Sequence, residues 1–209
     1  MEGVGAILNN QTAGFKDLSG NLNPLTALNP NTSGMNFVPG KLGNAVSFDG
    51  IDDYLTLGRH LTNGYPKLSY FGWFKTSSAA SQGVIDEWTN SASFIFQVSG
   101  KVNLYLSTGG TNPGWQNNVS GLLNDGIWHH FGVVYDGSNE ILYIDGAQVF
   151  STAGTGIIGN ISSTYFKIGA WAGAGEAVTG FMNGQIDEIS VYNRSFSSSE
   201  VKAIYNSEK

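Results

Sequence analysis

Short apolar stretches alternate with tight-turn dipeptides along most of this chain, and this pattern limits the fold more than any other feature. Asp-Gly or Asn-Gly pairs lie between the stretches at 49–50, 125–126, 136–137, 145–146 and 183–184. Such pairs suit tight hairpins, because type I′ turns need a positive φ at both central positions. The clearest predicted hairpin is Glu140–Ile144, then Asp145-Gly146, then Ala147–Phe150.

Ten of the apolar stretches are predicted strands, at a spacing of roughly 8–12 residues. They are Ala45–Phe48, Tyr54–Leu57, Leu68–Lys75, Gly83–Trp88, Ser93–Val98, Val102–Ser107, Trp128–Tyr135, Glu140–Ile144, Tyr165–Ala170 and Gly184–Tyr192. Residues 9–36 and 108–126 are polar and irregular, and are predicted to form a loop after an N-terminal strand and a cap over one end of the sheets. The pattern predicts a β-sandwich or jelly roll.

One helix is predicted at the end of the chain. Ser197 and Glu200 have the spacing of a capping box, in which each side chain bonds the backbone N–H of the other residue. Val201, Ile204 and Tyr205 follow at helical spacing, so one face should pack on the sandwich. No linker or fixed-period repeat divides the chain, and we predict one domain over residues 1–209.

Composition and charge exclude several classes of function. The formal net charge is −6 and the basic residues are scattered singly, so nucleic-acid binding is not expected. No apolar run approaches the ~20 residues that cross a bilayer, and membrane insertion is not expected either. The chain has no cysteine, which excludes disulfides and thiolate sites. The first residues, MEGVGAILNNQTAG, lack the features of a signal peptide, so either export takes another route or a signal precedes them.

Six segments carry motifs that are specific when taken together. The first is residues 41–54 (KLGNAVSFDGIDDY), and the others are 68–74, 128–137, 142–146, 184–189 and 197–205. In order and spacing they resemble the laminin-G-like group of the concanavalin A-like lectin/glucanase family over most of residues 14–206. The resemblance implies an all-β, concanavalin A-like jelly-roll sandwich of two antiparallel sheets, one of them concave, with a short C-terminal helix. Val4–Leu8 departs from it by lacking an aromatic-rich first strand.

The resemblance also implies a structural calcium site. Asp17, Gly20 and Asn21 match a family loop, and Asp187 matches the aspartate of the last long strand. In related jelly rolls these positions hold one Ca²⁺ on the side away from the ligand groove. Carboxylate, amide and carbonyl oxygens are the ligands that Ca²⁺ prefers. The alternative is that Asp17 begins an Asx turn and that Asp187 pairs with a surface cation.

Catalytic arrangements are not evident. A glycosidase of this shape needs two carboxylates facing one sugar, and on a strand that requires positions two or four apart. Asp86-Glu87 and Asp187-Glu188 are adjacent and should point to opposite faces, so we predict no enzyme activity. His129 and His130 diverge for the same reason, with one expected to support the sheet and the other to face solvent.

Aromatic residues outside the strand cores offer ligand contacts. Trp88, Trp115 and Trp171 lie at strand ends or in Gly/Asn-rich loops, and Asn117 and Asn118 are nearby in sequence. Rigid rings with adaptable amides are typical of shallow contact sites. The alternative is that these tryptophans close the ends of the sandwich.

Together these observations predict a non-catalytic module that binds carbohydrate or adheres to a glycan-bearing surface. Its expected location is extracellular, on a cell surface or on a virion. The first alternative is a structural or decoration protein of a virion or appendage, acting as a scaffold or homo-oligomer. The second is a glucanase-like hydrolase or a polysaccharide lyase.

Overall fold

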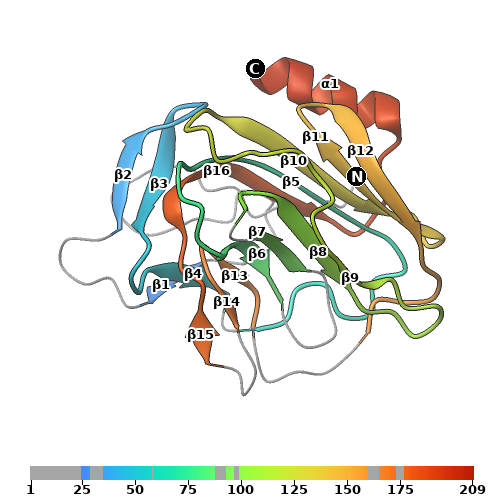
Figure 1. Cartoon of the computed structure of the whole chain (residues 1–209). Helices are drawn as coiled ribbons and strands as arrows, with labels where there is room; N and C mark the ends of the chain where they lie inside the picture. Colours follow the sequence, from blue (N-terminus) through green and yellow to red (C-terminus); the bar gives the residue numbers. More distant parts are fainter. Residues whose placement is uncertain are drawn as a thin grey trace.

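The strands of this chain form two stacked sheets (Figure 1). The computed structural model describes residues 25–28, 35–57, 59–87, 93–96, 99–159, 165–172 and 177–209. Sheet I has the order β1 (Thr26–Leu28), β4 (Tyr54–Thr56), β13 (Lys167–Ile168), β6 (Gln82–Asp86), β7 (Ser93–Phe96), β8 (Val102–Leu106) and β9 (Gly114–Gln116). Sheet II has the order β12 (Ala147–Ala153), β11 (Asn139–Ile144), β10 (His129–Tyr135), β5 (Leu68–Lys75), β16 (Asn183–Tyr192), β3 (Asn44–Asp49) and β2 (Asn36–Pro39).

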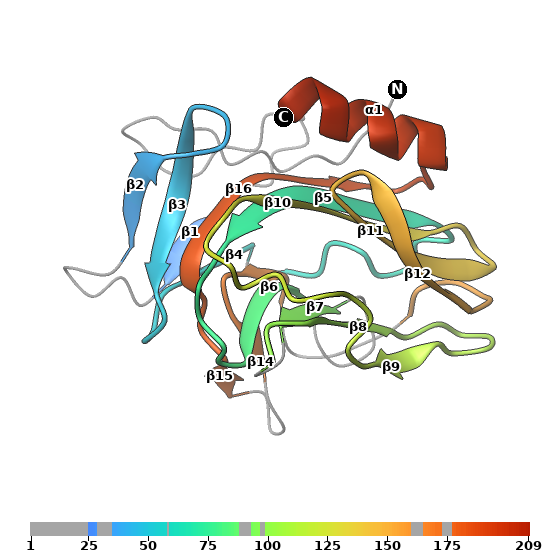
Figure 2. The same cartoon turned by 45° about the horizontal axis from the view of Figure 1, so that its top comes forward.

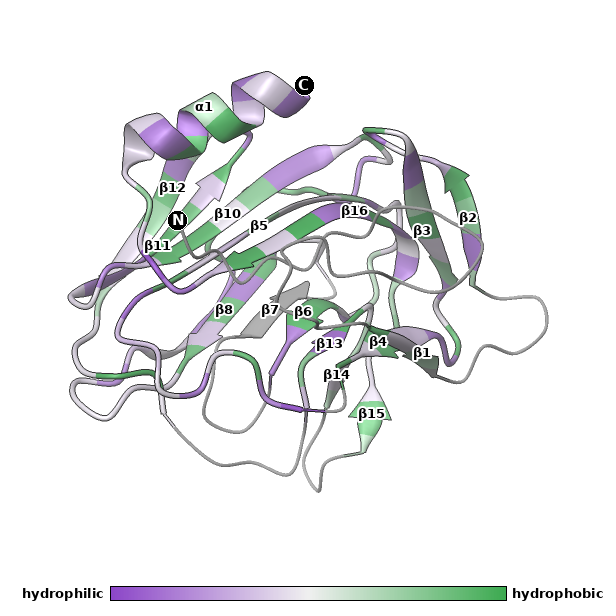
Figure 3. Cartoon of the chain, turned by 180° about the vertical axis from the view of Figure 1, so that it is seen from behind, coloured by the Kyte–Doolittle hydropathy of each residue, from purple (hydrophilic) through white to green (hydrophobic). Residues whose placement is uncertain are grey.

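The main core lies between the two sheets. Sheet II contributes Phe48, Phe74 and Phe131, and sheet I contributes Leu55, Ile85 and Leu104, all of them buried. Inner strands such as β8 place alternate side chains in this core, and polar and apolar bands alternate along β16 and β3 in Figure 3. The predicted all-β sandwich of two antiparallel sheets is confirmed.

Sheet II is covered on its other face by the helix α1 (Ser198–Glu208), as Figure 2 shows. Val201 of α1 is buried against Phe71, Val134 and Tyr143 in a second apolar cluster. The predicted capping box is present: the Ser197 hydroxyl accepts the Glu200 N–H, and the Glu200 carboxylate accepts the Ser197 N–H. Because both faces of sheet II are covered, every residue of β10 is buried.

The turn pairs have different roles. Asp145-Gly146 joins β11 to β12 with φ values of 50° and 75°, as the predicted hairpin requires. Asp49-Gly50 makes no hairpin, because β3 and β4 belong to different sheets and the chain crosses between the layers here. Asn183-Gly184 is not a turn either, since it lies at the start of β16.

The strands that sequence analysis missed are short. β1 and β2 lie at edges of the two sheets, and β9 lies within the segment 108–126 that was predicted to be irregular. β14 (Trp171–Ala172) and β15 (Val178–Thr179) form a separate two-stranded ribbon. β2 and β9 bury few side chains, so they carry little of the apolar alternation by which strands are recognised.

Candidate functional site

A partly exposed aromatic pair lies at the β9 edge of sheet I. Leu104 and Leu106 of β8 point into the core, so Tyr105 between them points to the outer face. Tyr105 is directly opposite Trp115 on β9, with ring centroids 4.9 Å apart and ring planes at 47°. Trp115 is 39% exposed, and this edge lies away from α1 in Figure 2. The two rings form an aromatic surface open to solvent.

Amide side chains hold the chain beside this pair. The Asn103 amide donates to the Asn117 side-chain oxygen at 2.7 Å, and its own oxygen accepts the Asn118 N–H at 2.8 Å. Asn118 has φ 55°, a left-handed conformation that asparagine tolerates. Its side-chain oxygen accepts from the Ser99 hydroxyl at 3.3 Å. Asn117 and Asn118 are exposed, and within the described residues their NH₂ groups donate no side-chain hydrogen bond.

We call Tyr105, Trp115, Asn117 and Asn118 the aromatic–amide site. Three of its members were predicted from sequence, and Tyr105 was missed, as was the supporting Asn103. The signal for both is the alternation in β8, Val102-Asn103-Leu104-Tyr105-Leu106. It places the side chains of Asn103 and Tyr105 together on the face away from the core.

The middle of the same sheet face is closed by the protein. Lys167 and Asp86 are paired across β13 and β6, with Nζ 3.6 Å from a carboxylate oxygen, and both are buried. Asp86 also accepts the backbone N–H of Ala172 on β14 at 3.1 Å. A buried ion pair of this kind depends on such additional hydrogen bonds. β14 therefore packs beside β6, whereas Trp115, Asn117 and Asn118 at the β9 edge of the same sheet are exposed.

Of the other two predicted tryptophans, the structure describes only Trp171. Trp171 lies on β14, which packs against β6, and its indole nitrogen is buried without a hydrogen-bond partner. β7 and β8 lie between β6 and β9, so the structure does not bring Trp171 to Trp115. Trp88 lies outside the described residues. Both residues stay predictions as ligand contacts.

The predicted calcium set is described only at Asp187. Its carboxylate is buried and accepts the N–H groups of Lys41, Leu42 and Glu188 at 2.8, 3.0 and 2.9 Å. Burial raises the pKa of Asp187, and these three donors lower it. Asp187 thus fastens the turn at 40–43 to β16, a role that sequence analysis missed. Asp17, Gly20 and Asn21 lie outside the described residues, and the calcium site stays a prediction.

The adjacent carboxylates have separate partners. Asp86 pairs with Lys167, whereas Glu87 accepts from the Leu61 N–H and the Thr62 hydroxyl, each at 2.7 Å. Glu188 has φ 50° at an irregularity in β16. The aromatic–amide site consists of two aromatic rings and two amides, groups that can stack on a ligand and hydrogen-bond to it.

The expectation that one histidine faces solvent is wrong, because both are buried. His129 lies 2.9 Å from an oxygen of Asp145 and 3.2 Å from one of Asp125, and the Asp145 hydrogen bond raises its pKa. His130 packs on Phe71, and burial lowers its pKa to about 4. They do point to opposite faces, as predicted, but α1 covers the face that His130 occupies.

Two stacked antiparallel sheets in this strand order form a jelly-roll sandwich. The family model described as "Concanavalin A-like lectin/glucanases superfamily" matches residues 49–202, and the chain belongs to this superfamily. The resemblance inferred from the sequence motifs is confirmed. No curated protein matches the chain in sequence.

Solved structures show the same fold at low identity. Domain 4 of AbnA, an extracellular arabinanase from Geobacillus stearothermophilus solved with arabinotriose, has a TM-score of 0.73 and 18% identity, covering 98% of this chain and 100% of that one. The binding domain of Paraclostridial Mosquitocidal Protein 1 has a TM-score of 0.71 and 15% identity, covering 97% and 52%. The binding domain of Botulinum Neurotoxin DC, solved with SialylT, has a TM-score of 0.71 and 15% identity. The match covers 99% of this chain and 51% of that one. The chain spans about half the length of these toxin domains. No helix among the described residues is long and apolar enough to cross a membrane.

Proposed function

We propose that this chain is a non-catalytic carbohydrate-binding module and that glycans bind at the aromatic–amide site. The observation that carries the proposal is the Tyr105–Trp115 pair on the open end of sheet I. Sugar rings have apolar C–H faces that stack on aromatic rings, and their hydroxyls accept from amide donors such as those of Asn117 and Asn118. The glycan complexes of two structural neighbours support the ligand class.

The site is built as an open surface, with consequences for its ligands. Trp115 is on the edge strand β9, so a glycan chain can extend past the edge. Asn103 is buried and already satisfied by Asn117 and Asn118, so it orders the loop without contacting ligand. A pre-ordered loop reduces the entropy cost of binding.

We also propose that the module acts outside the cell, on glycan-bearing surfaces. We propose further that Asp17, Gly20, Asn21 and Asp187 hold a structural Ca²⁺.

A glycan array followed by calorimetry on the best ligand tests the proposal. Trp115→Ala should weaken binding at least about tenfold, which corresponds to about 1.4 kcal/mol, because it removes the exposed ring. The matched control is Phe37→Ala, which removes the ring of a residue that is 49% exposed on β2, the edge strand of sheet II. Phe37→Ala should bind as the wild type does. Equal binding by the wild type and Trp115→Ala would show that glycans do not bind at the aromatic–amide site.

A further inference from the structure

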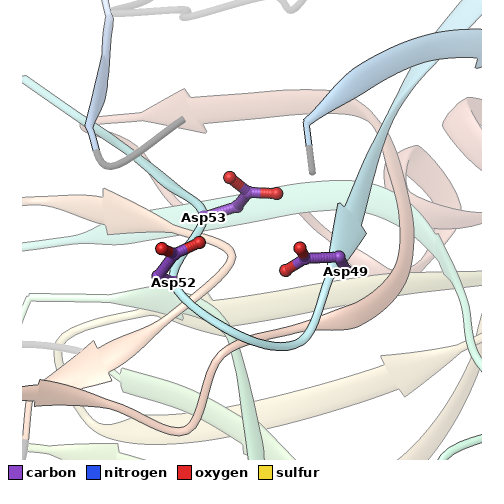
Figure 4. Close-up of side chains that lie close together, drawn as sticks. All are labelled: Asp49, Asp52 and Asp53. Atoms are coloured by element: carbon purple, nitrogen blue, oxygen red, sulfur yellow. The ribbon is translucent and has the colours of Figure 1, made fainter. Parts of the chain in front are cut away.

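Three carboxylates meet where the chain crosses from sheet II to sheet I. Asp49 ends β3, and Asp52 and Asp53 directly precede β4. One oxygen from each of the three lies within 4.8 Å of those from the other two. Figure 4 shows the three side chains grouped around this crossover. They share no residue with the predicted set of Asp17, Gly20, Asn21 and Asp187.

Asp53 is the unusual member of this group. Its residue is fully buried, and neither carboxylate oxygen has a hydrogen-bond partner within the described residues. Burial raises the pKa of Asp53, as do the charges of Asp49 and Asp52, and the nearby backbone N–H of Asp49 offsets part of this rise. A buried carboxylate with no hydrogen-bond partner is costly, and such groups need a compensating ligand. A single proton would neutralise Asp53 and still leave one oxygen and the new O–H without partners.

The geometry suits a hard divalent cation. Oxygens bound to Ca²⁺ at about 2.3–2.6 Å lie no more than about 5 Å apart, even on opposite sides of the ion. The three oxygens lie within 4.8 Å of one another, so one ion can reach all three. An all-oxygen, carboxylate-rich set favours Ca²⁺ over transition metals, which prefer nitrogen and sulfur. We propose that Asp49, Asp52 and Asp53 form a Ca²⁺ site that fastens the β3–β4 crossover.

The backbone turn brings the residues together. Gly50 has φ +83°, and the Ile51 N–H donates to Asp49 Oδ1 at 2.8 Å, which reverses the chain so that Asp53 returns toward Asp49. Two carboxylates thereby approach across a five-residue loop. A cation that bridges them joins the last residue of a strand in one layer to the start of a strand in the other.

The chain contains a matched control for this loop. Asp125-Gly126-Ile127 has the same three residue types, with Gly126 at φ +80° and the Ile127 N–H donating to Asp125 Oδ1 at 3.1 Å. Within the described residues, Asp125 belongs to no group of three possible metal ligands, and its partner is His129. Asp125→Asn therefore repeats the chemical change of Asp49→Asn in the same turn without the neighbouring carboxylates.

Calorimetric titration of chelator-treated protein with CaCl₂, together with thermal melting, tests the proposal. Asp53→Asn and Asp49→Asn should each weaken calcium binding at this site at least tenfold, and Asp125→Asn should leave it unchanged. Asp53→Asn should also raise the melting temperature of the calcium-free protein, because it removes a buried charge. It should abolish the part of the calcium-induced rise in melting temperature that binding at this site causes.

Asp17→Asn separates this site from the other proposed one. If both sites exist, wild type binds two ions and each of Asp17→Asn and Asp53→Asn binds one. Calcium binding that is lost in Asp17→Asn and unchanged in Asp53→Asn and Asp49→Asn overturns the proposal. So does a wild type that binds no calcium. Asp49 is partly exposed, so Asp49→Asn supplies the answer if Asp53→Asn does not fold.

Discussion

Glu140→Gln should stabilise the protein by roughly 4 kcal/mol at pH 8.5, with a much smaller effect at pH 4. Glu140 is 1% exposed on β11, and its Oε2 has no hydrogen-bond partner within the described residues. Burial raises its pKa from an ordinary 4.5 to about 8. The folded protein keeps this proton up to about pH 8, whereas the unfolded chain loses it near pH 4.5.

The sign of the pH dependence follows from that difference. Between pH 4.5 and 8 the unfolded chain binds fewer protons at this position, so the free energy of unfolding falls as the pH rises. Glutamine carries no charge and removes this contribution. Urea unfolding of both proteins at pH 4, 6 and 8.5 measures it, and pH 4 is the internal control because Glu140 is mostly protonated in both states there. Parallel curves of stability against pH would contradict the assignment.

Glu87→Ala is expected to cost about 3–5 kcal/mol of stability, the usual cost of removing one partner from a buried charged network. Glu87 follows β6 and is 1% exposed. One oxygen accepts the Leu61 N–H, and the other accepts both the N–H and the hydroxyl of Thr62. Alanine leaves these buried donors without an acceptor, and the segment around Leu61 loses its anchor to sheet I.

Glu87→Gln separates the hydrogen bonds from the volume of the side chain. Glutamine keeps one acceptor oxygen, but its NH₂ group faces the donors that the second carboxylate oxygen accepted from. An intermediate loss of stability of about 1–3 kcal/mol is therefore expected. The denaturant midpoints of the wild type, Glu87→Gln and Glu87→Ala measure this order of stability. Equal stability of all three proteins would show that the network does not hold this segment.

Much of the fold was predictable because its determinants are local. The eight residues Leu68–Lys75 were predicted as a strand with the observed bounds, and the Asp145-Gly146 hairpin and the Ser197 cap follow from short-range turn and capping chemistry. β1, β2 and β9 were missed because short edge strands with exposed side chains show little apolar alternation. Their pairing depends on neighbours that are distant in sequence.

The site was predictable only in part, for a related reason. Trp115, Asn117 and Asn118 stand out as aromatic and amide residues in a loop-like segment, but the partner ring of Tyr105 comes from register across β8 and β9. The burial of His130 depends on where α1 packs, which helical spacing does not show. The loop from Asp49 to Asp53 carried a family motif, and only the folded crossover brings its carboxylates within reach of one ion.

The central claim is that glycans bind at the outer face of sheet I, and indole resonances test it most directly. The five tryptophans give separate indole N–H signals in a nitrogen–proton correlation spectrum. Titration with the best array ligand should shift the signal of Trp115 and the side-chain amides of Asn117 and Asn118. The Trp73 indole, which donates to Glu208 beneath α1, should stay fixed. Shifts confined to Trp73 and Trp128, at sheet II, would contradict the account.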